Sequence, residues 1–551
     1  MGDFKNYKIP FTPNKNYKKK VAYFSMEFGI DQALKIYSGG LGFLAGSHMR
    51  SAYELKQNLI GIGILWKYGY YDQIRSADQS MNVLFQEKIY SFLVDTDIKF
   101  QIDINGHPVF VKAFYLPPEV FNSAPIFLLS TDLPENDYLA RTTSHKLYDS
   151  DKAARIAQNI LLGVGGAKLI DEIGYDPDIY HLNEAHGLAA GFYLYKKHEN
   201  LDQLKKQMVF TTHTPEEAGN EKTDIRLLEK MSFFCGLSLS KVREITDTWD
   251  DIFNHTLVAL RFAGIANGVS KIHGEVANRM WKSYDGICKI KAITNSQNKT
   301  YWADKTLSRA LEKDKKEKFF ERKKELKKEL FEVIADQTGQ MFDPNKLTIV
   351  WARRFAGYKR PDLITYSERA LTIIRDAKMP IQMIWAGKPY PMDYEATSTF
   401  NKLVHMSKEY PNVAVLVGYE LKLSGLLKKG SDIWLNNPLV TREASGTSGM
   451  TAAMNGSVNF STNDGWIPEF AKPGENCFVV PEVDINLPKH EQDAIDLENI
   501  MDLFENSVLP IYYNDQDKWY NIVKQSYLDV VKDFESGRMA DEYYNEMYKK
   551  V

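Results

Sequence analysis

Cysteine is scarce in this chain of 551 residues, which has only three. Cys235, Cys288 and Cys477 lie far apart and lack the spacing typical of metal ligands. Their odd number argues against a disulfide framework and is typical of a protein from a reducing compartment. We therefore expect no metal centre and a cytoplasmic location.

Long apolar runs and a strong charge of either sign are also missing. No stretch of about 18 apolar residues occurs, so no membrane-spanning helix is predicted. The N-terminal part reaches Lys15 and Lys18 without an apolar stretch, which is not the pattern of a secretory signal. A net charge of −3 gives no reason to expect a nucleic-acid or membrane partner.

What the sequence does contain is the composition of an ordinary globular protein, with 44% apolar and 26% charged residues. A chain of this length is too long for one core, so at least two domains are expected. Short apolar strands alternate with polar loops and helical runs, which predicts two doubly wound α/β domains with parallel sheets and a cleft between them. The expected bounds are residues 1–291, with an antiparallel insertion at about 64–130, and residues 292–500.

Polar or glycine-rich segments follow several strands of the first domain. A glycine-rich turn at residues 37–42 separates a strand at 21–26 from a helical run, and its glycines permit a ligand to approach the backbone. A tight turn without a ligand would also explain it. His186 and His213 each follow a short apolar strand, where open α/β sheets place their ligands. Both are candidate site residues, with a purely structural role as the alternative.

Two segments of the second domain predict an anion site. The strand at 347–352 ends in a segment with four cations within the eight residues Arg353–Arg360, which is typical of an anion clamp. The loop Glu443–Thr451 reads E-A-S-G-T-S-G-M-T and leads into a helix-forming run. Such a loop directs free backbone N–H groups at an anion, and its hydroxyl side chains add donors.

Nine motifs occur in one order along nearly the whole chain, and together they resemble the α-glucan (glycogen/maltodextrin) phosphorylase family, in particular its shorter bacterial and archaeal branch. The motifs are F-S-M-E-F-G, S-G-G-L-G, L-N-E-A-H-G, T-T-H-T-P-E, N-G-V-S-K-I-H-G, I-T-N, A-R-R-F-A-G-Y-K-R, A-G-K and E-A-S-G-T-S-G-M.

The resemblance implies a GT-B architecture of two Rossmann-like domains, with the helices of residues 501–551 packed back on the first domain. It implies transfer of a glucosyl unit between the end of an α-1,4-glucan and inorganic phosphate, with retention of configuration. It also implies pyridoxal phosphate, whose phosphate group exchanges a proton with the substrate phosphate. Family members are often dimers, so a homodimer is expected.

The same resemblance assigns roles to individual residues. Arg354 and Lys359 would hold the substrate phosphate and, with His213, form the catalytic set. The remaining residues are Gly40 and Leu41 near the phosphate, Asn183, His186 and Asn295 on the substrate, Glu443, Ala444, Ser445 and Gly446 on the glucosyl hydroxyls, and Thr447 and Ser448 at the cofactor phosphate.

Thr451 departs from the family pattern. The family has a lysine here that forms the Schiff base with pyridoxal, whereas threonine has no amine and cannot form an imine. Three functions remain open. The first is a phosphorylase that binds pyridoxal phosphate non-covalently or uses another anion. The second is a GT-B glycosyltransferase with a nucleotide-sugar donor, and the third is a non-catalytic glucan-binding relative.

Overall fold

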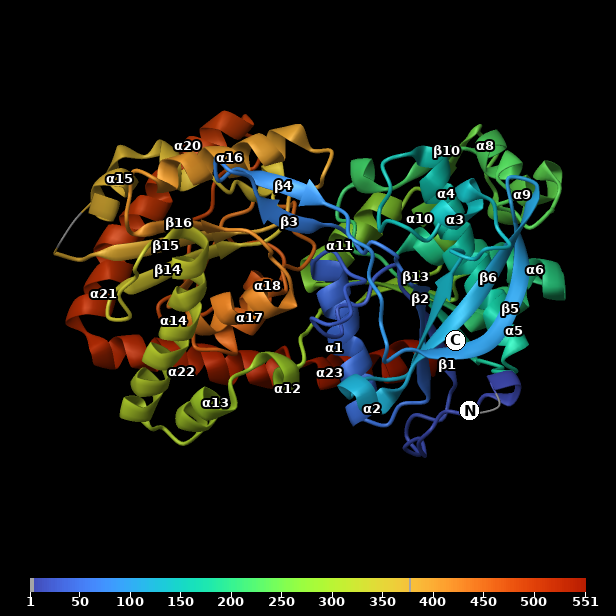
Figure 1. Cartoon of the computed structure of the whole chain (residues 1–551), viewed down its shortest axis with the longest axis horizontal. Helices are drawn as coiled ribbons and strands as arrows, with labels where there is room; N and C mark the ends of the chain where they lie inside the picture. Colours follow the sequence, from blue (N-terminus) through green and yellow to red (C-terminus); the bar gives the residue numbers. More distant parts are fainter. Residues whose placement is uncertain (1–3, 376–377) are drawn as a thin grey trace. The chain divides into compact units, whose positions relative to one another are not determined.

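The computed structural model describes residues 4–375 and 378–551, and the chain divides into two units. Unit 1 comprises Met1–Tyr71, Phe85–Asn295 and Ser536–Val551. Unit 2 comprises Asp72–Leu84 and Ser296–Glu535. Each unit contains a mostly parallel sheet with helices, so the α/β class predicted from the sequence is confirmed (Figure 1).

Unit 1 is built on a nine-stranded sheet of order β13-β12-β9-β8-β1-β2-β7-β6-β5. The strands from β13 to β7 pair in parallel, and β6 and β5 add antiparallel pairs at one edge. The strands of the sheet are β1 (Val21–Phe24), β2 (Leu59–Ile64), β5 (Val94–Ile104), β6 (His107–Leu116), β7 (Ile126–Ser130), β8 (Ile179–Asn183), β9 (Met208–Thr211), β12 (Ile265–Gly268) and β13 (Lys289–Ala292). A separate two-stranded sheet pairs β10 (Lys222–Asp224) with β11 (Ile252–Asn254).

The helices of unit 1 follow the strands in the alternation that the sequence predicts. They are α1 (Gly40–Glu54), α2 (Pro118–Phe121), α3 (Tyr138–Thr142), α4 (Lys152–Ile160), α5 (Gly166–Glu172), α6 (Ala189–His198), α7 (Leu201–Gln207), α8 (Ile225–Lys230), α9 (Leu239–Thr246), α10 (His255–Phe262), α11 (Lys271–Trp281) and α23 (Ser536–Glu542). A π-helical turn, Leu161–Gly165, joins α4 to α5.

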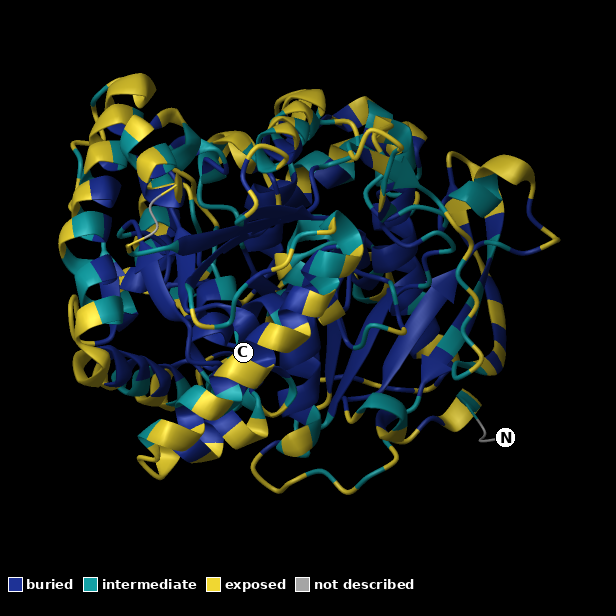
Figure 2. Cartoon of the chain, turned by 60° about the vertical axis from the view of Figure 1, so that its left-hand side comes forward, coloured by how far each residue is buried: buried dark blue, intermediate teal, exposed yellow. Residues whose placement is uncertain are grey.

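Unit 2 has a six-stranded, fully parallel sheet of order β16-β15-β14-β17-β18-β19. Its strands are β14 (Leu347–Ala352), β15 (Ile381–Ala386), β16 (Val413–Leu416), β17 (Ile433–Asn436), β18 (Val458–Ser461) and β19 (Cys477–Val479). Every residue of β14 is buried, as expected of a parallel strand covered on both faces. The buried strands are drawn dark blue in Figure 2.

The helices of unit 2 pack on both faces of this sheet. Leu330 and Leu427 share a core with Val350 and Ile384 on one face, and Met501 and Phe504 lie near Ile349 and Met383 on the other. The helices are α12 (Lys299–Trp302), α13 (Lys305–Glu312), α14 (Lys316–Thr338), α15 (Glu368–Arg375), α16 (Tyr394–Ser407), α17 (Leu421–Gly430), α18 (Ser448–Ala453), α19 (Ile467–Phe470), α20 (Lys489–Leu503), α21 (Leu509–Asn514) and α22 (Gln516–Asp533).

The hairpin of β3 (Asp72–Arg75) and β4 (Met81–Leu84) belongs to unit 2, although the sequence predicts the whole of about 64–130 as an insertion in the first domain. The Gln73 side chain donates to the carbonyl of Gly387 at 2.9 Å and accepts from the N–H of Gly418 at 3.0 Å. The N–H of Met81 donates to Asn401 at 2.9 Å. Strand pattern alone cannot reveal such distant partners, because both ends of the hairpin continue into unit 1.

The division at the C-terminal side also differs from the predicted bounds of 292–500 and 501–551. Unit 2 runs from Ser296 to Glu535 and therefore includes α21 and α22. Only Ser536–Val551 belongs to unit 1, where Ser536 and Ser51 share a hydrogen bond of 2.6 Å and Tyr548 bonds His181 at 2.7 Å.

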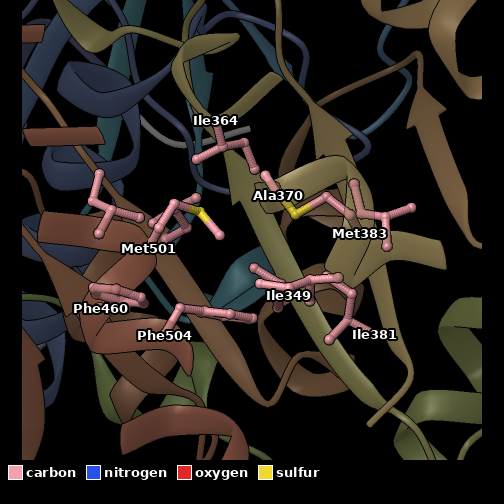
Figure 3. A pocket seen from close by; sticks show the side chains of 12 residues that line it. Ile349, Ile364, Ala370, Ile381, Met383, Phe460, Met501 and Phe504 are labelled. Atoms are coloured by element: carbon pink, nitrogen blue, oxygen red, sulfur yellow. The ribbon is translucent and has the colours of Figure 1, made fainter. Parts of the chain in front are cut away.

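A small apolar cavity of about 30 Å³ lies between the unit 2 sheet and the helices on one face (Figure 3). Ile349, Met383 and Phe460 line it from the strands, and Met501 and Phe504 line it from the opposite side. Aliphatic and aromatic side chains alone form its wall, so it offers no groups that bind a sugar or an anion. It is a packing defect of the core.

We expect Ile349→Ala to enlarge this cavity and to lower the stability of unit 2 by about 2–5 kcal/mol, because burial is lost and the site collapses only in part. The exposed Ile485 supplies the control, since Ile485→Ala changes stability by less than about 0.5 kcal/mol. Thermal and urea denaturation measure both. Equal midpoints for the two variants would contradict this account of the core.

Candidate functional site

The cations after β14 surround the carboxylate of Glu443. Lys359 Nζ lies 2.8 Å from Glu443 Oε2. Burial alone raises the pKa of Glu443, but the charges of Lys359 and Arg353, with a smaller effect of Arg354, outweigh it and hold the pKa below its ordinary value. Glu443 is therefore ionised at neutral pH and lies among three positive charges. Arg354, Lys359 and Glu443, which the resemblance groups around the substrate, are brought together.

Arg360 does not belong to this cluster, which corrects the prediction of four clamping cations. Its buried guanidinium pairs with Asp493 at 3.0 Å and Asp496 at 2.7 Å on α20, and it donates to the carbonyl of Asn437 at 2.8 Å. Arg360 thus fastens α20 to the loop after β17. A row of basic residues in the sequence does not show which of the side chains points away from the common cluster.

The loop that carries Glu443 is fixed by Asp464. The Asp464 carboxylate accepts from the backbone N–H groups of Arg442 at 3.1 Å and Glu443 at 2.9 Å. Burial raises the pKa of Asp464 to about 6 even though the N–H of Glu443 and other backbone donors lower it. Gly446 has a φ of +83°, a left-handed conformation that glycine adopts without strain.

Ala444 and Ser445 follow Glu443 in the same loop. Ser445 is buried, and within the described residues its Oγ has no hydrogen-bond partner. A buried hydroxyl in this state costs about 1–3 kcal/mol. Ser445 therefore presents an unused hydroxyl beside Glu443, as the resemblance implies for a residue that binds the sugar.

Helix α18 starts directly behind this loop, but it has only six residues. Thr447 precedes it, and Ser448 Oγ accepts from the indole N–H of Trp434 at 3.3 Å. The buried Thr451 donates its hydroxyl to the carbonyl of Ser448 at 3.0 Å. Its side chain is thus bonded to its own helix.

In unit 1 the buried carboxylate of Glu27 fixes the glycine-rich turn before α1. It accepts from the N–H of Ser38 at 2.6 Å, the N–H of Gly39 at 3.2 Å and the hydroxyl of Tyr148 at 2.7 Å. Burial raises the pKa of Glu27, and these donors oppose that rise. Gly40 and Leu41 open α1 directly after this turn.

A chain of hydrogen bonds joins this turn to the ends of β8 and β9. His213 Nε2 lies 2.8 Å from Asn183 Oδ1, Asn183 Nδ2 donates to Ser25 Oγ at 3.1 Å, and Ser25 Oγ donates to the carbonyl of Glu27 at 2.8 Å. Burial, together with His273 and His186, lowers the pKa of His213 to about 3. His213 is therefore a neutral imidazole at neutral pH, with its Nε2–H on Asn183.

Glu184 lies beside His213 in a strained backbone conformation, with φ +69° and ψ 169°. This region is almost confined to glycine and costs about 1–3 kcal/mol for other residues. The carboxylate accepts from the N–H of His213 and from Thr214 Oγ1, and burial raises the pKa of Glu184 to about 7. Strain and a shifted pKa at a strand end are typical of a functional residue.

His186 and Asn295, the other predicted residues of unit 1, each keep a buried polar atom without a partner among the described residues. These atoms are Nδ1 of His186 and Oδ1 of Asn295. The His186 ring lies 5.9 Å from that of Tyr148, which itself bonds Glu27. Asn295 is the last residue of its segment of unit 1. Both therefore have an atom to offer to a ligand.

Comparison with known proteins identifies the family. A family model described as carbohydrate phosphorylase matches residues 251–549. An uncharacterized protein of Methanocaldococcus jannaschii is 45% identical, over 96% of this chain and 100% of that protein. Maltodextrin phosphorylase of Thermococcus litoralis is 32% identical, over 100% of this chain and 74% of its own length. Glycogen phosphorylase of Aquifex aeolicus is 30% identical, over 97% and 87%.

The chain belongs to the carbohydrate phosphorylase family. Within the described part of the chain, no helix is long and apolar enough to cross a membrane. Nor do three or more histidine, cysteine or acidic side chains of the described residues gather as metal ligands would.

The family's pyridoxal phosphate fits this site only in part. Thr447 and Ser448 offer hydroxyls where the resemblance places the cofactor phosphate. Thr451 offers no amine, and its hydroxyl is bonded to the carbonyl of Ser448. Residue 451 therefore does not fit a covalent link to this cofactor.

Three site residues were not singled out from the sequence: Glu27, Glu184 and Asp464. Glu27 and Glu184 stand inside recognised motifs, so their position in F-S-M-E-F-G and L-N-E-A-H-G was the available signal. Asp464 lies outside every motif. Its role depends on a contact across 21 residues of chain, which no local pattern indicates.

Gly40 and Gly42 provide a matched pair of variants. A Cβ at Gly40 would meet no described atom within 4 Å, whereas one at Gly42 would lie 2.6 Å from Glu27 Oε2. We expect Gly40→Ala to fold normally but to weaken phosphate binding, because it fills the space in front of the turn. Gly42→Ala should lower stability by about 1–3 kcal/mol by overpacking. Calorimetric phosphate titration and thermal unfolding measure both, and unchanged phosphate affinity in Gly40→Ala would refute this role.

Glu184 should make stability depend on pH. Its pKa is about 7 in the folded protein and about 4.3 in an unfolded chain, so the folded state retains a proton that the unfolded state releases between these values. Its contribution to stability therefore falls as pH rises from 4 to 7, by up to about 3 kcal/mol. Glu184→Gln should show a smaller fall between pH 5 and pH 8 in urea denaturation. The exposed Glu217→Gln is the control, and identical pH profiles for both variants would exclude the shift.

Proposed function

We propose that the protein is a retaining α-glucosyltransferase that cleaves α-1,4-glucans by phosphorolysis to give glucose 1-phosphate. The observation that carries the proposal is the ionised Glu443 among Arg353, Arg354 and Lys359. Lys359, Arg353 and Arg354 all act electrostatically on Glu443, and such positive charge suits the binding of an inorganic phosphate, while Glu443 can accept a hydrogen bond from a sugar hydroxyl.

The chemistry of glucosyl transfer needs such a site. The transition state resembles an oxocarbenium ion, so an anion held beside it stabilises the developing charge and serves as nucleophile. Arg354 and Lys359 would orient the phosphate, and Ser445 would donate its hydroxyl to the glucosyl unit. When bound, the family's cofactor supplies a second phosphate group that exchanges a proton with the substrate phosphate.

The neutral His213 suits a site where a cationic sugar develops, because it adds no positive charge. Its ring is held by Asn183 and its backbone N–H by Glu184. The GT-B architecture that the sequence predicts is part of this proposal. A homodimer stays a prediction. We infer a reducing, cytoplasmic location from Cys235, Cys288 and Cys477, which are all free thiols.

Lys359→Gln should reduce phosphorolysis by about 10²–10³, because it removes one charge-stabilising donor from the phosphate. It should also raise the KM for phosphate. Lys402→Gln is the control, since that side chain is 51% exposed on α16 and pairs with Asp362. Phosphate release from glucose 1-phosphate with maltodextrin measures both variants.

The same assay, run with UDP-glucose and ADP-glucose as donors, tests the donor class. The positively charged site would also hold a diphosphate, so these donors are the strongest alternative. Turnover with glucose 1-phosphate alone supports phosphorolysis. Turnover with a nucleotide sugar alone would overturn it.

A further inference from the structure

A row of buried side chains crosses the sheet of unit 1 two residues before the candidate site. It comprises Tyr23 on β1, His181 on β8, Thr211 on β9 and Asn267 on β12. The strand pairing sets Tyr23 against His181, and Thr211 against Asn267. Interior strands of parallel sheets are usually continuous apolar runs, and a buried polar group is costly unless it is hydrogen-bonded. Three polar residues in such strands therefore need an explanation other than packing.

The side chains of the candidate site form a second row beside the first. Ser25, Asn183 and His213 each lie two residues after a member of the first row. Residues two apart in an extended chain point to the same face of a sheet. The contact of His181 with Thr211 and that of Asn183 with His213 both join residues 30 positions apart. The two rows are therefore successive rungs between the same pair of strands.

Hydrogen bonds run through the first row in one direction. Thr211 Oγ1 donates its only proton to Asn267 Oδ1 at 2.6 Å, so it accepts a hydrogen bond from His181 Nε2 at 2.7 Å. Burial lowers the pKa of His181 well below its ordinary value, so the ring is neutral and carries one N–H, at Nε2. Its Nδ1 accepts from the hydroxyl of Tyr548 at 2.7 Å. His181 is thus held at both ring nitrogens.

The C-terminal segment covers this row. Residues Tyr543–Tyr548 form a π-helical turn, in which hydrogen bonds join residues five apart. Residues five apart in an α-helix are separated by about 140° around the axis. Here the rings of Tyr543 and Tyr548 instead stack with their centroids 6.2 Å apart, and they lie 5.1 Å and 5.6 Å from the ring of His181. The π-helical turn therefore directs both tyrosines at His181.

We propose that His181 and Tyr548 are positioning residues for Asn183 and His213. They fix the separation of β8 and β9 one rung before the site. The contact of His213 Nε2 with Asn183 Oδ1 at 2.8 Å depends on that separation. A buried network in which every member is hydrogen-bonded specifies one arrangement, whereas apolar side chains of similar volume specify it less sharply. The inference rests on the proposed function only for the reaction that His213 serves.

The alternative is a network that stabilises the fold without affecting the site, and His48 provides the matched control. His48 is buried like His181, and its ring lies 4.9 Å from that of Tyr23 and 5.3 Å from that of Tyr543. Among the described residues, however, neither of its ring nitrogens has a hydrogen-bond partner. Leucine at either position removes a ring from the same aromatic cluster, but only at His181 does it also break this chain of hydrogen bonds.

Steady-state phosphorolysis by the full chain tests the proposal at a temperature where circular dichroism shows every variant to be folded. His181→Leu should lower kcat by about 10–10²-fold, because displacement of a reacting group by about 1 Å has an effect of this size. The KM for phosphate should stay within about twofold, since Arg354 and Lys359 are unchanged. His181→Gln should restore most of kcat, because its amide again offers a donor to Thr211.

Nuclear magnetic resonance of protein labelled with ¹⁵N-histidine gives a second readout, which does not depend on activity. Tyr548→Phe removes one hydroxyl and leaves the packing in place, so it carries the test if His181→Leu does not fold. The ring signals of His213, assigned with His213→Gln, should shift in Tyr548→Phe and stay in place in His48→Leu. Tyr548→Phe should also lower kcat, by less than His181→Leu does.

Unchanged kcat in folded His181→Leu would overturn the proposal, as would an equal loss of kcat in His48→Leu. Unmoved His213 signals in Tyr548→Phe would overturn it as well, because the site would then not sense the network.

The two readouts separate this inference from the proposed function. A shift of the His213 signals in a protein that shows no phosphorolysis would support the positioning role and refute the function. Full phosphorolysis by folded His181→Leu would do the reverse.

Discussion

The contact between Lys359 and Glu443 is the interaction on which the unit 2 site depends. Each charge would be costly alone in this partly buried place, because desolvation disfavours an ion without a partner. As an ion pair, Lys359 and Glu443 lie 2.8 Å apart. The site therefore contains both a carboxylate that accepts hydrogen bonds and a cation that attracts anions. Arg353 and Arg354 add further positive charge near Glu443. Asp464 completes the arrangement, because it fixes the backbone from which Glu443 extends.

Unit 1 uses a carboxylate for a comparable purpose. Glu27 binds the backbone of the glycine-rich turn, and through Ser25 and Asn183 its position is coupled to that of His213. Pre-organised sites require such rigid positioning, because a displacement of a reacting group by about 1 Å strongly lowers the reaction rate. The strained Glu184 lies at the end of the same chain of contacts. The strained backbone of Glu184 lowers the stability of the fold but holds the Glu184 side chain in this position.

Much of this could be predicted from the sequence because short apolar strands followed by polar or glycine-rich loops are local patterns. They placed His213 and Lys359 in segments that follow strands and Glu443 in a loop before a helix, and the residue type alone showed that Thr451 cannot form an imine. Features that depend on distant contacts could not be predicted. The direction of Arg360 toward α20, the anchor at Asp464 and the docking of the β3–β4 hairpin on unit 2 each join segments far apart in the chain. The positive φ of Glu184 could not be predicted from the sequence either, because tertiary contacts alone impose it.

The way in which the chain passes between the units has a consequence for biosynthesis. It crosses from one unit to the other at residues 71/72, 84/85, 295/296 and 535/536. A ribosome releases the hairpin of residues 72–84 more than two hundred residues before the rest of unit 2, and it releases residues 536–551 of unit 1 after all of unit 2. Unit 1 therefore cannot complete its core until the whole of unit 2 has been translated. Nascent chains of this protein should expose unpaired apolar surface for longer than chains whose domains are contiguous, and they depend more on protection from aggregation.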